Sequence, residues 1–260
     1  MTPTASPVPP RLLSLGDSAW TVEFGQTIDP AVHGRVLGLS HLLESLAGDG
    51  RLPGVIEWVP AFRSVTVHFD PERTDALALR AQLAELAGQA GSLSAAGKRW
   101  RLPVCFDADC APDLADVAAA RGLTPEAVVE RLSGTVFSVY MLGFLPGFPY
   151  LGGLPPELEM PRLATPRKVV PARSIAIAGR MCAAYPWQSP GGWRLLGRTP
   201  IRLFDPANAR RPALLAPGDQ VVWQPVERAA YDAIERACAA GAFDLASLLD
   251  PADQPQGERQ

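Results

Sequence analysis

Residues 142–155 read LGFLPGFPYLGGLP and follow directly on FSVYM, a run typical of a buried β-strand. The stretch mixes four glycines and three prolines with Phe144, Phe148 and Tyr150, far more breakers than one turn requires. Glycine lets the main chain approach a neighbour closely, and proline holds a loop on one path. We therefore interpret the stretch as the exit from a strand into a tightly wound loop of a β-rich domain.

The sequence on either side of this stretch predicts a domain made mostly of strands. Short apolar runs alternate with Gly/Pro turns between residues 136 and 226, in FSVYML, SIAIAG, WRLLG, IRLFD and QVVWQPV. Many short strands with regular turns are typical of a β-barrel or a sandwich. Before them we expect the strand RLPVCF and two short helices, one over 112–120 and one capped by Thr124. The predicted domain covers 100–226, and a helical tail covers 227–260.

Residues 11–90 predict a smaller α+β domain ahead of the barrel. RLLSLGDSAWTVEFG indicates a hairpin, and GVIEWVPAFRSVTVHFDP supplies two further strands. Apolar residues spaced by three and four predict helices over 30–47 and 74–88. We expect a disordered leader over 1–10 and a Gly/Ser/Ala-rich linker over 91–99.

Composition excludes several classes of protein. The 260 residues carry a formal net charge of −3, so no overall basic field would attract nucleic acid. No run reaches the roughly 18 apolar residues of a membrane-spanning helix. The four cysteines form no CxxC pair and no evident disulfide framework, and we expect no metal site. A reduced, cytoplasmic protein is the simplest interpretation.

Familiar catalytic patterns fit the sequence poorly. GSLSAAGKR has the wrong glycine spacing for a phosphate-binding loop and carries Arg where a hydroxyl belongs. All three histidines lie before residue 70, so a Ser-His-Asp hydrolase in the barrel domain is unattractive. Cys105 and Cys110 in CFDADC are best interpreted as packing or incidental thiols. The acidic cluster FDADCAPD is best interpreted as a solvated loop and a helix start rather than a cation site.

Residues 142–203 contain the best candidates for a binding site. Arginines offer planar donors for carboxylate or phosphate, aromatic side chains offer walls, and glycines keep main chain accessible. The candidate residues of these three kinds are Arg162, Arg167, Arg194 and Arg198, then Tyr150 and Trp193, then Gly147, Gly191 and Gly192. Tyr185 and Trp187 are further candidates for the walls. On chemistry alone, a ligand pocket and a tightly wound small barrel remain equally good interpretations.

The order of motifs in this segment resembles one family. LGFLPGFPYLGGLP, PRLATPR, VPARSIAIAG, YPWQSPGGWRLLGRTP, LFDP and APGDQV are similar to the family of 5-oxoprolinase B subunits. That family also includes the Kip-type inhibitor of a sporulation kinase and the matching carboxyltransferase half, labelled allophanate hydrolase subunit 1. GVIEWVP, VHFDP and APDL extend the resemblance into the first half of the chain.

The resemblance implies a fold and a function. It implies a ferredoxin-like α+β domain followed by a cyclophilin-like β-barrel, an α+β fold class overall. It further implies a protein that acts with subunits C and A in the ATP-dependent conversion of 5-oxoproline to glutamate, with magnesium accompanying ATP. The small amide or lactam substrate would meet the arginines named above. Neither Lys98 nor Lys168 lies in a biotinylation motif, so biotin is not expected on this chain.

The sequence departs from the family pattern at four positions. Arg173 stands where the family has Gly, Met181 and Cys182 replace a Gln-Thr pair, and Leu132 replaces a His. We expect all four positions to lie near the pocket, where Arg173 supplies a new anion contact or crowds the site. These departures leave open a divergent paralogue with another amide-like substrate, or a regulatory protein that inhibits a sensor histidine kinase. Half of a biotin-dependent carboxyltransferase is a third, weaker alternative.

Overall fold

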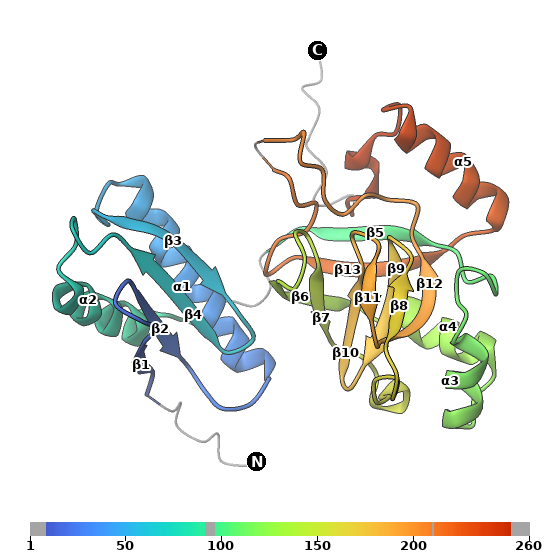
Figure 1. Ribbon diagram of the computed structural model, residues 1–260, viewed down its shortest axis with the longest axis horizontal. Coiled ribbons are helices and arrows are strands. Elements are labelled where there is room, and N and C mark those ends of the chain that lie inside the picture. The colour runs from blue at the N-terminus through green and yellow to red at the C-terminus, as the bar shows by residue number, and fades with distance from the viewer. Residues whose placement is uncertain (1–8, 92–96, 210, 251–260) are drawn as a thin grey trace. The chain divides into compact units, whose positions relative to one another are not determined.

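The computed structural model describes residues 9–91, 97–209 and 211–250, and the chain divides into two compact units (Figure 1). Unit 1 is Met1–Ala96 and unit 2 is Gly97–Gln260. Most of the predicted leader, the centre of the predicted linker and the end of the predicted tail lie outside the described residues. No helix among the described residues is long and apolar enough to cross a membrane.

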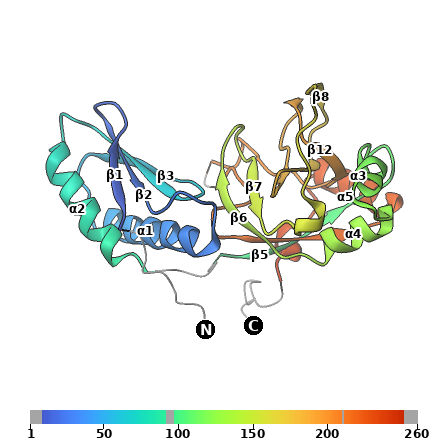
Figure 2. The same cartoon turned by 90° about the horizontal axis from the view of Figure 1, so that it is seen from below.

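Unit 1 is a four-stranded antiparallel sheet with two helices. Its elements are β1 (Arg11–Ser14), β2 (Ala19–Glu23), α1 (Pro30–Gly48), β3 (Val55–Pro60), β4 (Ser64–Phe69) and α2 (Ala76–Gln89). The strand order is β1-β2-β4-β3, and Figure 2 shows both helices on the same side of the sheet. The ferredoxin-like arrangement is not confirmed, because the chain runs ββαββα where that motif runs βαββαβ.

Local sequence explains the elements of unit 1. Asp29 accepts a hydrogen bond from the amide of Ala31 at 2.8 Å and is followed by Pro30, so α1 begins with a side-chain cap and a preset φ. Strand β4 alternates as predicted, with Val65 and Val67 fully buried. The predicted helices and strands of this unit are therefore confirmed as elements.

Unit 2 is built mainly of strands. Its strands are β5 (Arg99–Val104), β6 (Phe137–Leu142), β7 (Pro149–Gly152), β8 (Arg167–Val170), β9 (Ser174–Ala178), β10 (Met181–Ala184), β11 (Ser189–Gly191), β12 (Arg194–Arg198) and β13 (Gln220–Pro225). Its helices are α3 (Leu114–Arg121), α4 (Pro125–Ser133) and α5 (Arg228–Ala239), with short 3₁₀ turns at Pro156–Leu158 and Leu245–Leu248. Thr124 caps α4 by accepting from the amide of Ala127 at 3.2 Å, as predicted.

The main sheet of unit 2 forms a nearly closed barrel. Seven strands follow the order β12-β9-β10-β7-β6-β13-β5, and only the β13–β5 pair is parallel. Just beyond the end of β5, the amide of Cys105 donates to the carbonyl of Arg198 on β12 at 2.9 Å, and the reverse bond is 3.0 Å. These two bonds bring the first and last strands of the sheet together. Strands β8 and β11 form a separate two-stranded ribbon.

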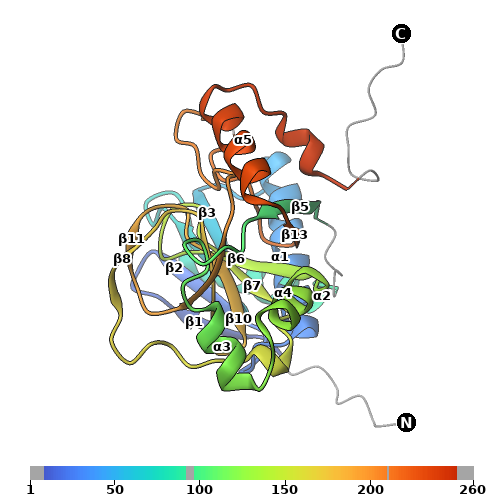
Figure 3. The ribbon, with the colours of Figure 1, turned by 90° about the vertical axis from the view of Figure 1, so that its right-hand side faces the viewer.

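Helices pack against the barrel and complete its main core. Strands β5, β6, β9 and β13 and helices α3 and α4 contribute to one cluster of buried apolar side chains, with Trp223, Phe137 and Leu132 at 0% exposure. Helix α5, in the first part of the predicted tail, adds the half-buried Ile234 and Cys238 to this cluster and so packs onto the barrel (Figure 3). A second, smaller set of buried side chains lies apart from the main core and holds the candidate site.

Candidate functional site

The opening stretch of the sequence leaves β6, forms a tight loop and returns as β7. Phe144 and Gly147 both have positive φ, at 69° and 76°. A Cβ atom on Gly147 would lie 2.7 Å from the Cβ of Phe204, so only glycine lets the loop pack against that residue. The predicted accessible main chain at Gly147 is thus covered by another segment of the same unit.

Four aromatic rings form the centre of the candidate site. Phe148 is almost fully buried and packs against Tyr150, Tyr185 and Trp193 with ring-centre distances of 5.0, 5.1 and 6.1 Å. Tyr150 and Trp193 are themselves 6.0 Å apart, with their rings steeply inclined. We call Phe148, Tyr150, Tyr185 and Trp193 the aromatic cluster. The structure therefore places together the two predicted wall residues, Tyr150 and Trp193.

Arg162 lies at the exposed edge of the aromatic cluster. Its guanidinium carbon is 5.8 Å from the centre of the Trp193 ring, a cation–π distance. Burial raises the pKa of the Tyr150 phenol, and the charge of Arg162 opposes that rise. Within the described ranges Arg162 forms no hydrogen bond or ion pair, so its donors face solvent or a ligand.

Arg167 is held beside the same cluster by a buried carboxylate. Its Nη2 donates to Asp113 at 2.5 Å, and the other oxygen of Asp113 accepts from the amide of Leu195 at 2.7 Å. The Asp113 side chain is only 5% exposed, so these buried contacts fix the start of α3 against β8 and β12. The Nη1 atom of Arg167 is buried and has no partner among the described residues. The Nη2 atom of Arg167 is therefore hydrogen-bonded, and its Nη1 atom is not.

Gly191 lets the β8–β11 ribbon approach the aromatic cluster, and Gly192 follows it. Gly191 lies opposite Arg167 in the ribbon, and a Cβ there would lie 2.4 Å from the hydroxyl oxygen of Tyr185. The carbonyl of Gly192 accepts from the amide of Leu163 at 2.7 Å. Gly191 is thus required by a close approach to Tyr185, and Gly192 anchors the segment that carries Arg162.

The other two predicted arginines, Arg194 and Arg198, are the first and last residues of β12. Arg194 is paired with Ile177, a residue of the main core, whereas Leu195 is paired with Ala176 of the aromatic side. Arg198 lies at the barrel seam, where its main chain bonds to Cys105. The described contacts bring Arg162 and Arg167 to the aromatic cluster and do not bring Arg194 or Arg198 there.

The four departures from the family pattern occupy different surroundings. Met181 packs at the edge of the aromatic cluster. Leu132 and Cys182 are fully buried in the main core, whereas the aromatic cluster belongs to a separate set of buried side chains. Burial raises the pKa of the Cys182 thiol to about 12. The sequence could not show this because it does not reveal which side of a strand or helix faces which core.

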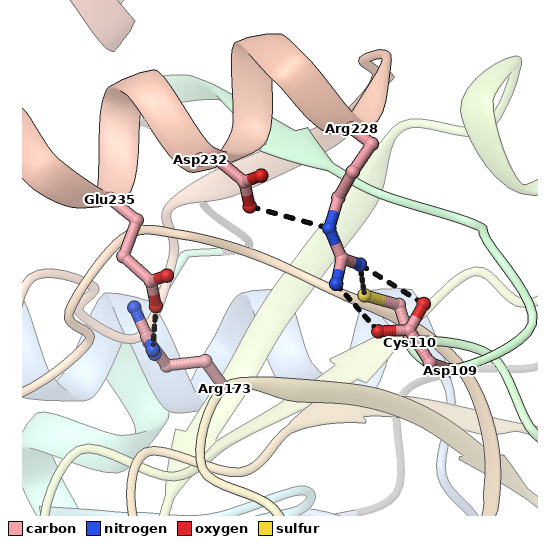
Figure 4. Close-up of polar contacts among 6 residues, drawn as sticks. All are labelled: Asp109, Cys110, Arg173, Arg228, Asp232 and Glu235. Atoms are coloured by element: carbon pink, nitrogen blue, oxygen red, sulfur yellow. Dashed lines mark hydrogen bonds and ion pairs between the residues drawn. The ribbon is translucent and has the colours of Figure 1, made fainter.

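Arg173 and helix α5 form contacts that sequence reasoning missed. Arg173 forms an ion pair with Glu235 on α5 (Figure 4). Its Nη1 also donates to the carbonyl of Pro200 at 2.9 Å. At the start of the same helix, Arg228 contacts both carboxylate oxygens of Asp109, at 2.7 and 3.0 Å, and the sulfur of Cys110 at 3.3 Å. We call these two groups the α5 contacts. No local motif indicates either of them.

The sequence matches the family model for the carboxyltransferase domain, subdomain C and D, over residues 10–215. The chain therefore belongs to this carboxyltransferase-domain family. Within the family, it is 36% identical to the 5-oxoprolinase B subunit of Bacillus subtilis (strain 168), in a match that covers 86% of this chain and 95% of the relative. It is 37% identical to the 5-oxoprolinase B subunit of Escherichia coli O157:H7, over 83% of this chain and 95% of the relative.

Solved structures support the same fold. The crystal structure of TTHA0988 is 34% identical and matches with a TM-score of 0.69 over 80% of this chain. This chain spans only 40% of TTHA0988. The K. lactis urea amidolyase matches with a TM-score of 0.74 over 95% of this chain and 16% of that protein. At 24% identity, this second likeness concerns the fold, a barrel-like sheet shared with the urea amidolyase.

Proposed function

We propose that the protein is the B subunit of an ATP-dependent 5-oxoprolinase, which opens the lactam ring of 5-oxoproline to give glutamate. The observation that carries this proposal is the match to two bacterial 5-oxoprolinase B subunits along almost their whole length. The name of these relatives implies a complex of several subunits. In our proposal the partners are subunits C and A.

The aromatic cluster with Arg162 and Arg167 is the site we assign to this activity. A lactam is a stabilised amide with a poor leaving group, so its carbonyl must be activated before water attacks. ATP, when bound with magnesium, would supply a phosphoryl group for that activation. The chain's own contribution is to bind phosphate or carboxylate oxygens through the unpaired donors of Arg162 and Arg167. Tyr150 and Trp193 would orient the ring and exclude water.

The buried contacts of Arg167 support this assignment. Asp113 holds the guanidinium in place, and the buried Nη1 of Arg167 lacks a partner that a phosphate oxygen would supply. A donor fixed in advance stabilises developing charge without reorganisation during the reaction. We assign no magnesium ligand to this chain. We propose that magnesium is bound by the phosphates and by another protein of the complex.

Two finer features of the protein belong to the same proposal. We infer that the barrel is of the cyclophilin-like kind, because seven strands close through the Cys105–Arg198 bonds. We also propose that the protein works in the cytoplasm, because its four cysteines are free thiols and a reducing compartment would keep them so.

Reconstitution tests the proposed function. The chain is mixed with subunits C and A, and glutamate formation and ATP hydrolysis are measured with and without 5-oxoproline. We expect 5-oxoproline-dependent turnover that disappears when this chain is omitted. A folded three-subunit complex that hydrolyses no ATP in response to 5-oxoproline would disprove the proposal. In that case, inhibition of histidine-kinase autophosphorylation by the chain alone would favour the regulatory alternative.

A further inference from the structure

Unit 2 has a cavity beneath α5 that shares no residue with the aromatic cluster. Its volume is about 640 Å³, within the usual range for small-molecule sites. Its walls come from the segments around Arg173, Trp187 and Arg202 and from the buried side of α5. Three prolines, Pro186, Pro200 and Pro206, lie in these walls and restrict their backbone.

One wall of the cavity is aromatic. Trp187 and Phe204 pack with their ring centres 6.1 Å apart, and Trp187 remains 41% exposed. An exposed indole at a cavity wall offers a flat surface for a ring. Phe204 in turn packs closely against the loop at Gly147, because a Cβ atom on that glycine would lie 2.7 Å from the Cβ of Phe204.

The two arginines in the cavity wall differ in their contacts with carboxylates. Arg173 is paired with Glu235, whereas Arg202 forms no hydrogen bond or ion pair within the described part of the chain. Asp205 uses one carboxylate oxygen to accept from the amide of Ala207 at 3.0 Å. Burial raises the pKa of the Cys238 thiol in this cavity, and the charges of Arg173 and Arg202 oppose that rise. Arg202 thus remains available for an anion.

Arg173 has an unusual backbone conformation at the wall of the cavity. Its φ is 67°, a left-handed conformation that glycine adopts freely and that a branched or long side chain disfavours. Two main-chain hydrogen bonds fix this conformation. The amide of Arg173 donates to the carbonyl of Tyr185 at 2.5 Å, and the carbonyl of Arg173 accepts from the amide of Thr199 at 3.0 Å. Residues retained in such a conformation concentrate at functional sites.

We propose that this cavity is a second binding site, for a small cyclic carboxylic acid. The carboxylate pairs with Arg202, the ring lies on Trp187 and Phe204, and the Arg173–Glu235 pair forms the opposite wall. A ring with an N–H group would also meet the free oxygen of Asp205. The proposal goes beyond the proposed function, because it needs neither ATP nor another protein of the complex.

Calorimetric titration of the full chain, alone and without nucleotide, tests the proposal. The probes are 5-oxoproline, which is the substrate under the proposed function, benzoate as an unrelated ring acid, and 2-pyrrolidinone as the ring without a carboxylate. We expect saturable binding of at least one acid below about 10 mM, with 2-pyrrolidinone at least about 10-fold weaker. Binding of 5-oxoproline alone would identify the substrate as the source, and comparable binding of benzoate would identify a general ring-acid site.

Three variants are predicted to weaken, strengthen and leave unchanged the affinity for the acid. Arg202→Gln should weaken binding by about 10-fold or more, because it removes the free cation. Glu235→Gln should strengthen binding several-fold, because it releases Arg173 from its carboxylate. Arg180→Gln, an exposed arginine outside the cavity, should leave binding unchanged. The indole N–H resonance of Trp187, identified with Trp187→Phe, should shift on titration.

Failure of this test is distinguishable from failure of the proposed function. No saturable binding of either acid up to about 10 mM, or equal affinity in Arg202→Gln and the unmodified chain, would overturn the second site. Neither result would affect turnover by the three-subunit complex. Conversely, an inactive complex would leave acid binding by the isolated chain intact.

Discussion

The aromatic cluster and the α5 contacts are two charged regions of the same unit, and they are built in different ways. At the aromatic cluster, Arg167 is fixed by Asp113, whose side chain is 5% exposed. At α5, Arg228 and Arg173 contact carboxylates that are 59% and 40% exposed. Removing one partner of a buried pair costs far more than disrupting an exposed pair. Burial of the carboxylate, rather than the number of ion pairs, therefore determines which region contributes more to the stability of the barrel.

The largest effect on stability is expected at Asp113. Asp113→Ala removes the acceptor of the buried Leu195 amide and leaves Arg167 without its partner. We expect the free energy of unfolding to fall by about 3 kcal/mol, measured by urea denaturation. Asp107→Ala is the matched control, because Asp107 is exposed on the same loop, and it should change stability by less than about 0.5 kcal/mol. Equal losses in the two variants would contradict the comparison.

A smaller effect is expected at Gly147, in the loop between β6 and β7. Gly147→Ala combines positive φ with a Cβ 2.7 Å from Phe204, and should cost about 2–3 kcal/mol of unfolding free energy. Gly179→Ala also has positive φ but no atom within 4 Å of the new Cβ, and should cost about 1 kcal/mol. The difference between the two variants measures the packing of the loop. If Gly147→Ala costs no more than Gly179→Ala, the close approach to Phe204 is not a constraint.

The positive φ of Arg173 predicts that its replacement by glycine and its replacement by alanine differ in stability. Arg173→Gly and Arg173→Ala both remove the contacts with Glu235 and Pro200, but only glycine relieves the positive φ. We expect the glycine variant to be more stable than the alanine variant by about 1 kcal/mol in urea denaturation. Equal stabilities would show that the left-handed conformation is not retained in the variants.

The exposed Arg228–Asp109 pair should have the smallest effect, and a pH-dependent one. The hydrogen bond from Arg228 lowers the pKa of Asp109 below its ordinary value. A lowered folded-state pKa gives stability that is present above the unfolded-state pKa and is lost as the pH falls through the folded-state value. The difference in urea midpoint between the unmodified chain and Asp109→Asn should therefore be small at neutral pH and vanish on acidification. A difference that grows on acidification would contradict this sign.

The sequence predicts much of the fold because its signals are local. The Thr124 cap, the alternation of β4 and the short strands between residues 136 and 226 each lie within a few consecutive residues. Tyr150 and Trp193 were predicted together as pocket walls because both are aromatic residues of the segment 142–203, and the structure brings their rings into contact. By contrast, the Arg173–Glu235 and Arg228–Asp109 contacts join residues 62 and 119 positions apart, and no spacing rule reports them.

The positions of the candidate arginines show the same limit. Four arginines were predicted together because they share one motif-rich segment, yet the described contacts join only Arg162 and Arg167 to the aromatic cluster, and the site role of Arg194 and Arg198 stays a prediction. Strand β12 has a register shift between Leu195 and Gly197, so simple alternation does not give the face of each side chain. Asp113 was missed as a partner of Arg167 because α3 and β8 meet only in the folded barrel.

We propose that Arg162, beside the aromatic cluster, binds an anionic group during the reaction. The most direct measurement is kcat/KM for 5-oxoproline-dependent ATP hydrolysis by the three-subunit complex carrying Arg162→Gln, with Arg180→Gln as the control for loss of an exposed arginine. Loss of a charge-assisted contact worth about 1.5–3 kcal/mol predicts a fall of about 10- to 100-fold in the first variant and none in the second. Equal kcat/KM values in the two variants and the unmodified complex would contradict the claim.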